Sequence, residues 1–535
     1  MSRTKFVGGM LWGAATSGLA VTGLWGAGTA AAACASISGI SAGTGCSSTA
    51  NSIAVASGAG STAESDGQFS RAIALGANSS ATAIGAGNQA YANGDNSLAD
   101  ASGGIGNSAT ATGIGSIALA GFSSTGSANN NTATARDGGT AYAGALSTNS
   151  SNNTAFATGF KSNAWAGYQT SDSGNNNATA NGVGSSAYAG SRAAFGNPSV
   201  NSSYNTATAT GANSGAFAGV SSTNASNNTA SASADSYASA GVYSTNANNN
   251  TASATGPFSG ANASVYSTNS SNNTASATGP NSSANAGFNS TNSSNSIASA
   301  TGLNSSASAT GAGNKAYAYG DNTLANASGG IGNSATATGI GSIALAGFSS
   351  TGSANNNTAT ARDGGTAYAG ALSTNSSNNT AFAAGFKSNA WAGYQTSDSG
   401  NNTATANGIG SSAYAGSRAV FGNPSINSSY NTATATGANS GAFAGVSSTN
   451  ASNNTASAGA DSYASAGVYS TDANNNTATA TGPFSGANAS VYSTNSSNNT
   501  ATATGPNSYA NAGFNVSGVG SFTATAGPNQ TVNKP

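Results

Sequence analysis

The 535-residue sequence has no histidine, two cysteines and very little charge. Charged residues make up 4% of the chain, whereas soluble domains average about 25%. Glu64 is the only glutamate. Acid–base catalysis therefore has almost no candidate side chains. Zinc, di-iron and copper sites lack the His or Cys clusters that they need. A net charge of −1 also gives no basic surface for contacts to nucleic acid. We therefore expect a protein that is not an enzyme, has no cofactor or metal and binds no nucleic acid.

Large apolar side chains are also scarce. Leu, Ile, Val and Phe number 11, 14, 15 and 17, and most of the 37% of residues that count as hydrophobic are alanine. This composition excludes a conventional globular core, and no apolar run after the N-terminus is long enough to span a membrane. Two classes remain, a disordered chain or a repeat solenoid with a thin core. Disordered chains are usually rich in charge and proline, which are scarce here.

The N-terminus has the features of an export signal. Arg3 and Lys5 precede a mildly apolar stretch that ends near Trp25, and four alanines, Ala30–Ala33, stand directly before Cys34. We expect residues 1–33 to be a signal peptide that is cleaved, leaving a mature protein that is secreted or on the cell surface. An uncleaved membrane anchor is the alternative interpretation.

Cys34 and Cys46 are the only cysteines and lie close together in the sequence. In an exported chain we expect them to form a disulfide that closes a short loop in an N-terminal segment, residues 34–70, which would also cap the fold. The alternative is a lipoprotein, because the alanines before Cys34 loosely resemble a bacterial lipobox. The leucine that usually stands three residues before the lipobox cysteine is missing.

A long internal duplication organises the chain. Residues 90–288 recur at an offset of 226, so that Trp165 corresponds to Trp391, and the differences between the copies are few and mild. Such near-identity indicates a recent duplication. The duplication predicts a first repeat block at 122–306, a second at 307–514, and a C-terminal tail or cap at 515–535.

A shorter period of about 22–23 residues lies inside each block. Its motif reads N-N-T-A-T-A-T-G, a turn, A-x-A-G-V-Y-S-T-N and another turn. One spacing in each block is longer than the others, and the segment Gly196-Asn197-Pro198-Ser199 indicates a loop insertion there. The first motif position falls in sixteen units, at Thr132, Thr154, Asn177, Thr206, Thr229, Thr251, Thr274 and Ser296, and at Thr358, Thr380, Thr403, Thr432, Thr455, Thr477, Thr500 and Phe522.

Alternation within the motif predicts strands and sets their orientation. The TATAT segment that begins at Thr206 has the period of two that is typical of a strand. In the second strand the central position takes Trp, Tyr, Phe, Ser or Asn, so it faces outward and its flanking alanines face inward. By the same parity Ala207 and Ala209 point inward. We predict an all-β protein, a parallel β-solenoid or β-roll with two strands per turn of about 22–23 residues, a narrow Ala-lined core and stacked Asn at the corners.

Residues 71–121 have a different rhythm, in which Gly76, Gly85 and Gly94 are nine residues apart. This segment, with a partial copy at 309–347, resembles the head repeats of trimeric autotransporter adhesins, which contain recurring S-x-A-I-G and A-x-A-x-G-x-x-S units. The resemblance implies a left-handed parallel β-roll, association of three chains, and a head that binds host matrix or cells. The heptad-patterned stalk and the membrane anchor of that family are not recognisable in this sequence.

An aromatic column is the first candidate contact face. Contiguous apolar surface that is exposed usually marks an interface, so we expect this column to contact a glycan or another chain. The alternative is a stacked ladder that only shields the strands. The column consists of Tyr142, Trp165, Tyr188 and Phe217, and of their copies Tyr368, Trp391, Tyr414 and Phe443.

A Thr-x-Thr ladder is the second candidate face. Paired hydroxyls and methyls that repeat on a flat face order water in ice-binding solenoids, although threonine is also an ordinary solvent-facing strand residue. Phe156, Asn177 and Phe522 interrupt the column. The clearest ladder residues are Thr206, Thr208, Thr210, Thr432, Thr434 and Thr436.

These observations favour an exported repeat protein that acts as a surface or secreted adhesin, or as a structural rod, through many weak contacts. We expect its partner to be host matrix, a glycan or another surface protein, with self-association as a further option. An ice-binding protein that uses the Thr-x-Thr ladder is the alternative.

Overall fold

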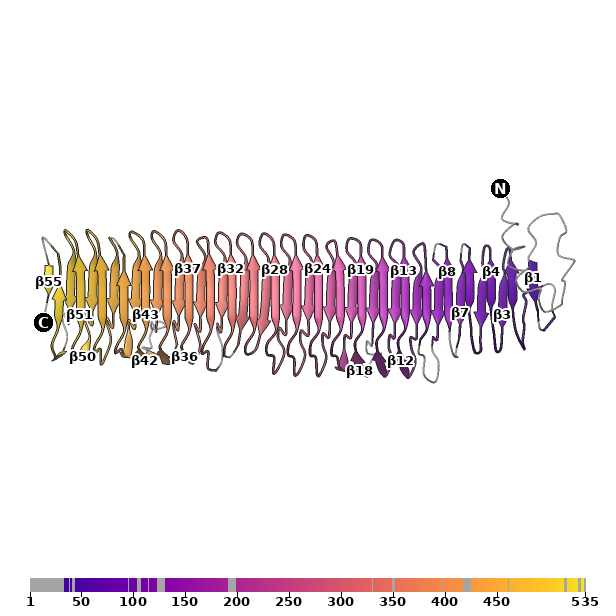
Figure 1. Ribbon diagram of the computed structural model, residues 1–535, viewed down its shortest axis with the longest axis horizontal. Helices are drawn as coiled ribbons and strands as arrows, with labels where there is room; N and C mark the ends of the chain where they lie inside the picture. The colour runs from indigo at the N-terminus through magenta and orange to yellow at the C-terminus, as the bar shows by residue number, and fades with distance from the viewer. Residues whose placement is uncertain are drawn as a thin grey trace.

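The computed structural model describes residues 33–533, with gaps at 38, 41–43, 95, 103–106, 114, 123–129, 191–198, 330, 349–351, 397, 417–424, 460, 514–516 and 528–530. The predicted signal peptide, apart from Ala33, therefore lies outside the described residues, as does most of the predicted loop insertion. The described residues build one elongated rod of strands and turns, without a helix (Figure 1).

Two parallel sheets run along the whole rod, and each coil of the chain adds one strand to each of them. Sheet A has 23 strands and sheet B has 22. Successive coils pair in register, so that Ala207 lies beside Ala178 of the coil before and Ala230 of the coil after. The prediction of an all-β parallel solenoid is confirmed. At a strand spacing of about 4.8 Å, 23 strands give a rod of about 105 Å.

The strands are short and evenly sized. Sheet A consists of β1 (Ala33–Ser36), β2 (Ala54–Ser57), β4 (Ala72–Leu75), β6 (Ala90–Asn93), β8 (Ser108–Thr112), β10 (Thr132–Ala135), β13 (Thr154–Thr158), β16 (Asn177–Asn181), β19 (Thr206–Thr210), β22 (Thr229–Ser233), β24 (Thr251–Thr255), β26 (Thr274–Thr278), β28 (Ile297–Thr301), β30 (Lys315–Tyr319), β32 (Ser334–Thr338), β34 (Thr358–Arg362), β37 (Thr380–Ala384), β40 (Thr403–Asn407), β43 (Thr432–Thr436), β46 (Thr455–Ala458), β48 (Thr477–Thr481), β51 (Thr500–Thr504) and β54 (Thr523–Thr525). Sheet B consists of β3 (Thr62–Ser65), β5 (Ser80–Ala83), β7 (Leu98–Ala101), β9 (Ile117–Ala120), β11 (Thr140–Ala143), β14 (Asn163–Ala166), β17 (Ser186–Ala189), β20 (Gly215–Ala218), β23 (Tyr237–Ala240), β25 (Gly260–Ala263), β27 (Ser283–Ala286), β29 (Ser306–Thr310), β31 (Leu324–Ser328), β33 (Ile343–Ala346), β35 (Thr366–Ala369), β38 (Asn389–Ala392), β41 (Ser412–Ala415), β44 (Gly441–Ala444), β47 (Tyr463–Ala466), β49 (Gly486–Ala489), β52 (Tyr509–Ala512) and β55 (Thr531–Asn533).

The coils differ in length, and the longer ones have a third side. Coils of 18 or 19 residues run from β2 to β8 and again from β28 to β32. Most others have 22–24 residues, enough chain for a short extra strand, so the prediction of two strands per turn is incomplete. The third-side strands are β12 (Asn149–Ser151), β15 (Asp172–Gly174), β18 (Ser199–Ser203), β21 (Ser222–Asn224), β36 (Asn375–Ser377), β39 (Asp398–Gly400), β42 (Ser425–Ser429), β45 (Ser448–Asn450), β50 (Thr494–Ser496) and β53 (Ser517–Val519).

The strand register corrects two positions of the sequence motif. Thr274 pairs with Ile297, and Thr500 pairs with Thr523, so Ser296 and Phe522 are not the first outward residues of their units. They occupy the preceding corner position instead, which asparagine fills in the neighbouring units. The sequence around these sites fits two strand registers that differ by one residue. A register shift of one residue exchanges the inward and outward faces of a strand.

Alanine forms nearly the whole interior, as the parity predicted. Ala207 and Ala209 of sheet A and Ala216 and Ala218 of sheet B are all 0% exposed. The side chains between them, such as Thr208 and Phe217, point outward and are half-buried. The two sheets therefore lie so close together that the core holds little more than methyl groups.

A ladder of buried asparagines lines one corner of the coil. Asn228 is typical: its backbone N–H and Nδ2 both donate to Oδ1 of Asn250, at 2.9 and 3.1 Å, and Nδ2 also donates to the Ser202 carbonyl. Its own Oδ1 accepts from the backbone N–H and Nδ2 of Asn205. Gly219, with a φ of +62°, makes room, because a Cβ there would collide with the Asn228 amide. The predicted corner asparagines thus link coil to coil inside the protein.

The N-terminal end of the rod has a cap of different geometry. β1 pairs antiparallel with β2 and covers the first edge of sheet A. Cys34 in β1 is joined to Cys46 by a disulfide, with their Cα atoms 5.4 Å apart. A sulfur in a disulfide is not free for a lipid, so the lipoprotein alternative does not fit this pairing.

We expect the inward alanines to tolerate no added bulk. Ala207→Leu together with Ala433→Leu should cost about 1–3 kcal/mol at each site, because overpacking forces the closely spaced sheets apart. Thr208→Leu with Thr434→Leu, one residue further along the same strands, should cost less than about 0.5 kcal/mol. Urea unfolding of the mature chain measures both pairs, and equal losses would refute the orientation of the strands.

We also expect the asparagine ladder to contribute strongly to stability. Asn228→Ala leaves the buried backbone N–H of Asn205 without its acceptor and removes one of the two donors to Asn250 Oδ1, and it should cost about 1–3 kcal/mol. Asn201→Ala, which removes exposed hydrogen bonds to Asp172 and Asn224, serves as the matched control. Amide hydrogen exchange in the coils around residue 228 should speed up only in the first variant.

Candidate functional site

The outer face of sheet A is a flat array of small hydroxyl side chains. Its middle column runs in register through β16 to β28 as Thr179, Thr208, Ser231, Ser253, Ser276 and Ser299. A second run passes from β40 to β54 through Thr405, Thr434, Ser457, Thr479, Thr502 and Thr525. The predicted ladder residues Thr206, Thr208, Thr210, Thr432, Thr434 and Thr436 all lie on this face.

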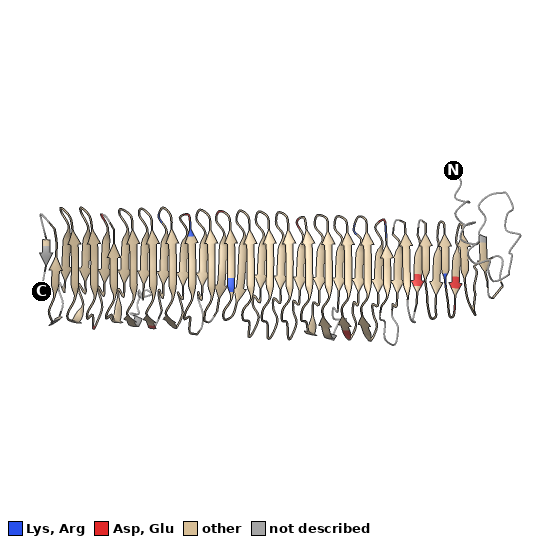
Figure 2. Cartoon of the chain, viewed as in Figure 1, with Lys and Arg blue, Asp and Glu red and all other residues tan. Residues whose placement is uncertain are grey.

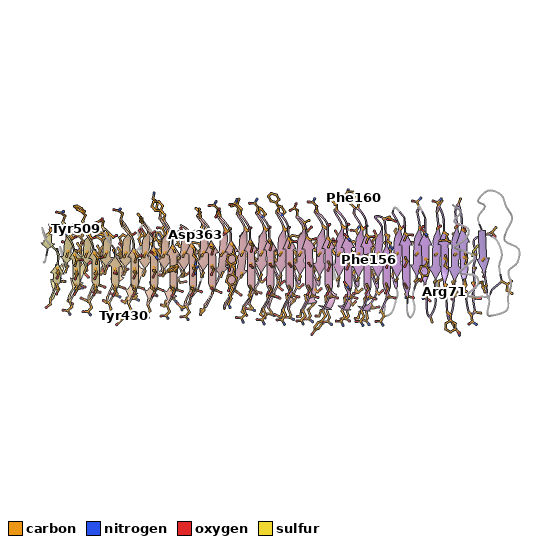
Figure 3. The ribbon with its side chains drawn as sticks, turned by 45° about the horizontal axis from the view of Figure 1, so that its top comes forward. Arg71, Phe156, Phe160, Asp363, Tyr430 and Tyr509 are labelled. Carbon is orange, nitrogen blue, oxygen red and sulfur yellow. A yellow bond between two sulfur atoms is a disulfide. The ribbon has the colours of Figure 1, made fainter. Side chains whose placement is uncertain are left out.

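Larger side chains divide this array. Phe156 and Phe382 each stand in the middle column at the N-terminal end of a run, and Lys315, Tyr317 and Tyr319 of β30 lie between the two runs (Figure 3). Asn177 interrupts an outer column, as predicted. The sequence-based assignment of Phe522 as a further interruption is wrong, because this residue occupies the inner corner. Each hydroxyl run therefore covers six neighbouring strands.

The outer face of sheet B contains the predicted aromatic column. Phe122, Tyr142, Trp165, Tyr188 and Phe217 follow one another along the rod, and the second block repeats the arrangement through Tyr368, Trp391, Tyr414 and Phe443. The ring centroids of Trp165 and Tyr188 lie 4.2 Å apart, and those of Tyr188 and Phe217 lie 4.7 Å apart at an interplanar angle of 11°. The eight residues predicted from the sequence thus all lie in the column.

The stacking of the rings determines which parts of them a partner could contact. The rings stack face to face along the rod, so within the column their faces cover one another and mainly their edges are open. All eight predicted members are half-buried rather than fully exposed. Burial raises the pKa of the Tyr142 phenol, and burial together with the neighbouring Tyr394 raises the pKa of Tyr368. Along most of the column, a partner would therefore meet mainly ring edges.

An open groove lined by aromatic residues runs beside the C-terminal end of each stack. After Phe217 the next coil supplies Ser239, which is buried, and the tilted ring of Tyr237 lies with its centroid 6.1 Å from that of Phe217. Residues of the corner that follows sheet B, among them Tyr168, Val220 and Tyr243, form the other wall of the groove. The groove has a volume of about 440 Å³, and its copy in the second block about 450 Å³. The sequence motif did not predict this groove, because it does not show how the residues after sheet B are folded. Their signal is the large apolar or aromatic residue that follows a glycine after a strand, as in Gly167-Tyr168, Gly219-Val220 and Gly241-Val242-Tyr243.

Both broad faces carry almost no charge among the described residues (Figure 2). No group of three or more His, Cys, Asp or Glu side chains suitable for a metal ion occurs in the part of the chain that the structure describes. The same part contains no helix long and apolar enough to cross a membrane. No protein-family model, curated protein or solved structure matches this chain with significance.

We predict that the aromatic column contributes to local stability. Trp165→Ala removes stacking on Tyr142 and Tyr188 and an edge contact with Tyr168, and should cost about 2–4 kcal/mol. Phe156→Ala, at a half-buried outward position of sheet A, should cost less than about 1 kcal/mol. Amide hydrogen exchange of the coils around each site measures both, and comparable effects would show that stacking adds nothing.

Proposed function

We propose that the mature chain acts outside the cell as a non-enzymatic adhesive or structural rod that binds through many weak contacts. Repetition is the observation that carries this proposal. Successive coils present Thr or Ser at the same position of sheet A over six strands in each run, and the aromatic column of sheet B recurs in both blocks. Host matrix, a glycan or another surface protein would meet many equivalent contacts, and their combined avidity exceeds the affinity of any single one.

The resemblance of residues 71–121 to trimeric autotransporter head repeats supports adhesion over a purely structural role. These residues form the shorter coils, which continue directly into the longer coils of the first block. The coils of β30 and β32 repeat that arrangement at the start of the second block. A head-like surface would thus recur within one rod, and association of further chains would multiply it.

The disulfide supports a location outside the cytoplasm. Disulfides form and persist mainly in oxidising compartments, where a protein with a weak hydrophobic core gains most from them. The bond between Cys34 and Cys46 closes the first coil beside the segment that we expect to be removed as a signal peptide. Export to the cell surface or the medium is therefore part of the proposal.

Ice binding is the second candidate, because the hydroxyl array on sheet A is flat and regular. Within one column, the hydroxyl residues of neighbouring strands lie about 4.8 Å apart. Neighbouring columns lie about 6.6 Å apart, because they contain alternate residues of each strand. Six successive strands, from β40 to β54, present Thr or Ser at the middle position. A water layer ordered by such a surface would match an ice crystal face through the spacing of the hydroxyl groups. No single residue would be essential for this match.

Repeat number should determine activity. We expect deletion of one 226-residue copy to lower retention on a cell or matrix-coated surface by more than the twofold loss of contacts, because avidity gains reach about 10²–10⁴-fold. Equal retention per molecule would contradict distributed binding. Thermal hysteresis that falls with the deletion and disappears on Thr208→Leu with Thr434→Leu would instead establish ice binding.

A further inference from the structure

Two exposed tyrosines are stacked on each other at the corner that follows sheet B. Tyr243 and Tyr266 lie in neighbouring coils, with their ring centroids 5.3 Å apart and an interplanar angle of 5°. Their copies Tyr469 and Tyr492 have the same centroid distance and an interplanar angle of 6°. The rings of the first pair are 62% and 51% exposed, and those of the second pair are 62% and 49% exposed. Each pair therefore holds two phenol rings next to each other at the surface of the rod.

The main chain holds the two rings in register, although the corner itself does not require tyrosine. The backbone N–H of Tyr243 donates to the carbonyl of Val265 at 3.0 Å, so the two coils are joined directly beneath the rings. Tyr243 and Tyr266 have φ angles of +56° and +53°, in the left-handed region that large side chains rarely adopt. Ser221 in the coil before and Asn289 in the coil after have left-handed φ angles at the same position. A small polar residue therefore builds this corner equally well.

Exposed tyrosine is the main oxidisable group of the chain beyond residue 33. That part of the sequence has no methionine and no histidine, and its two cysteines are joined in a disulfide. Methionine and free thiols, the side chains that usually take up oxidative damage, are therefore missing. Trp165 and Trp391 are the only tryptophans there, and each is half-buried between two stacked tyrosines. An oxidant that acts at the surface of the rod meets exposed phenols first.

We propose that each pair is a site of oxidative coupling, at which Tyr243 is joined to Tyr266, and Tyr469 to Tyr492, as dityrosine. The oxidant is hydrogen peroxide, used by a peroxidase that removes single electrons from phenols. Each phenol loses one electron and one proton, and the two phenoxyl radicals form a carbon–carbon bond between their ortho carbons. The hydrogen on each of these carbons then moves to the phenol oxygen of its ring. One peroxide takes up the two electrons and two protons and leaves as two water molecules.

The stacked geometry favours coupling within one chain over coupling between chains. Both rings of a pair are about half exposed or more, so they can rotate about their side-chain bonds without moving the alanine core. Two phenols held on adjacent coils have an effective concentration of at least the order of millimolar, whereas separate chains in a dilute solution are at about micromolar concentration. The product is a covalent link between successive coils. This modification goes beyond the adhesive or structural function and does not depend on what the faces of the rod bind.

The test removes one phenol of each pair and keeps the stacked rings. Tyr266→Phe with Tyr492→Phe deletes only the hydroxyl groups, so the variant retains its ring contacts but forms no phenoxyl radical at these positions. Tyr204→Phe with Tyr430→Phe is the matched control, because those tyrosines are 62% and 61% exposed and stack on no ring among the described residues. Tyr430 projects from the lower edge of the rod (Figure 3). Circular dichroism and melting establish that each chain is folded before oxidation.

The mature chain is oxidised in dilute solution with a plant peroxidase and hydrogen peroxide, and dityrosine is measured by its fluorescence. We expect the unmodified chain to form dityrosine while it still migrates as a monomer in denaturing electrophoresis. Mass spectrometry of elastase peptides should show the peptide with Tyr243 joined to the peptide with Tyr266, with the loss of two hydrogen atoms. The Tyr266→Phe with Tyr492→Phe variant should lose at least about nine-tenths of the fluorescence, because the remaining phenols have no stacked partner at this corner. The control variant should retain it.

Three outcomes would overturn the proposal. If the unmodified chain forms no dityrosine, the stacked pairs do not couple. If the Tyr266→Phe with Tyr492→Phe variant forms as much dityrosine as the unmodified chain, coupling takes place at other tyrosines. If covalent dimers form in place of the linked monomer, the exposed phenols react between chains and the stacking within each pair has no role.

Discussion

The close approach of the two sheets is the constraint on which the rest of the structure depends. Little more than a methyl group fits at the inward positions, so buried alanine recurs from one end of the rod to the other, at 0% exposure in most coils. Such a core buries little apolar area per coil, and hydrophobic burial alone cannot offset the entropy of ordering the chain. Hydrogen bonds between coils must supply the difference. The main-chain ladders of both sheets do so, together with the buried asparagine ladder, in which a side chain such as that of Asn228 accepts from one coil and donates to the next.

Under the same constraint, the side chains that differ from coil to coil lie on the outer surface. Because every coil has the same interior, an outward position can change from Thr to Phe or from Trp to Ser without disturbing the core. Where aromatic residues follow one another on sheet B, they stack and bury their faces, and each stack ends at a phenylalanine that is followed in the next coil by a buried serine, Ser239 or Ser465.

Much of this fold is readable from the sequence, because its period and parity are strict. The inward orientation of Ala207, the outward orientation of Phe217 and the parallel coil-to-coil pairing all follow from alternation and spacing. The register at Ser296 does not, because a small polar residue fits both the inner corner and the outer face. The third-side strands and the grooves also escaped prediction, since residues such as Tyr168 and Tyr243 lie in corners whose path depends on packing between coils and not on any local pattern.

The protein is one continuous rod whose length is set by the number of coils, and small-angle X-ray scattering of the mature chain tests this most directly. We predict a narrow particle about 105 Å long, shortened by about 48 Å when one 226-residue copy is removed, because ten strand spacings of about 4.8 Å are lost. A scattering profile of an expanded flexible chain, or a maximum dimension that does not fall with this deletion, would contradict the solenoid and with it the proposed surfaces.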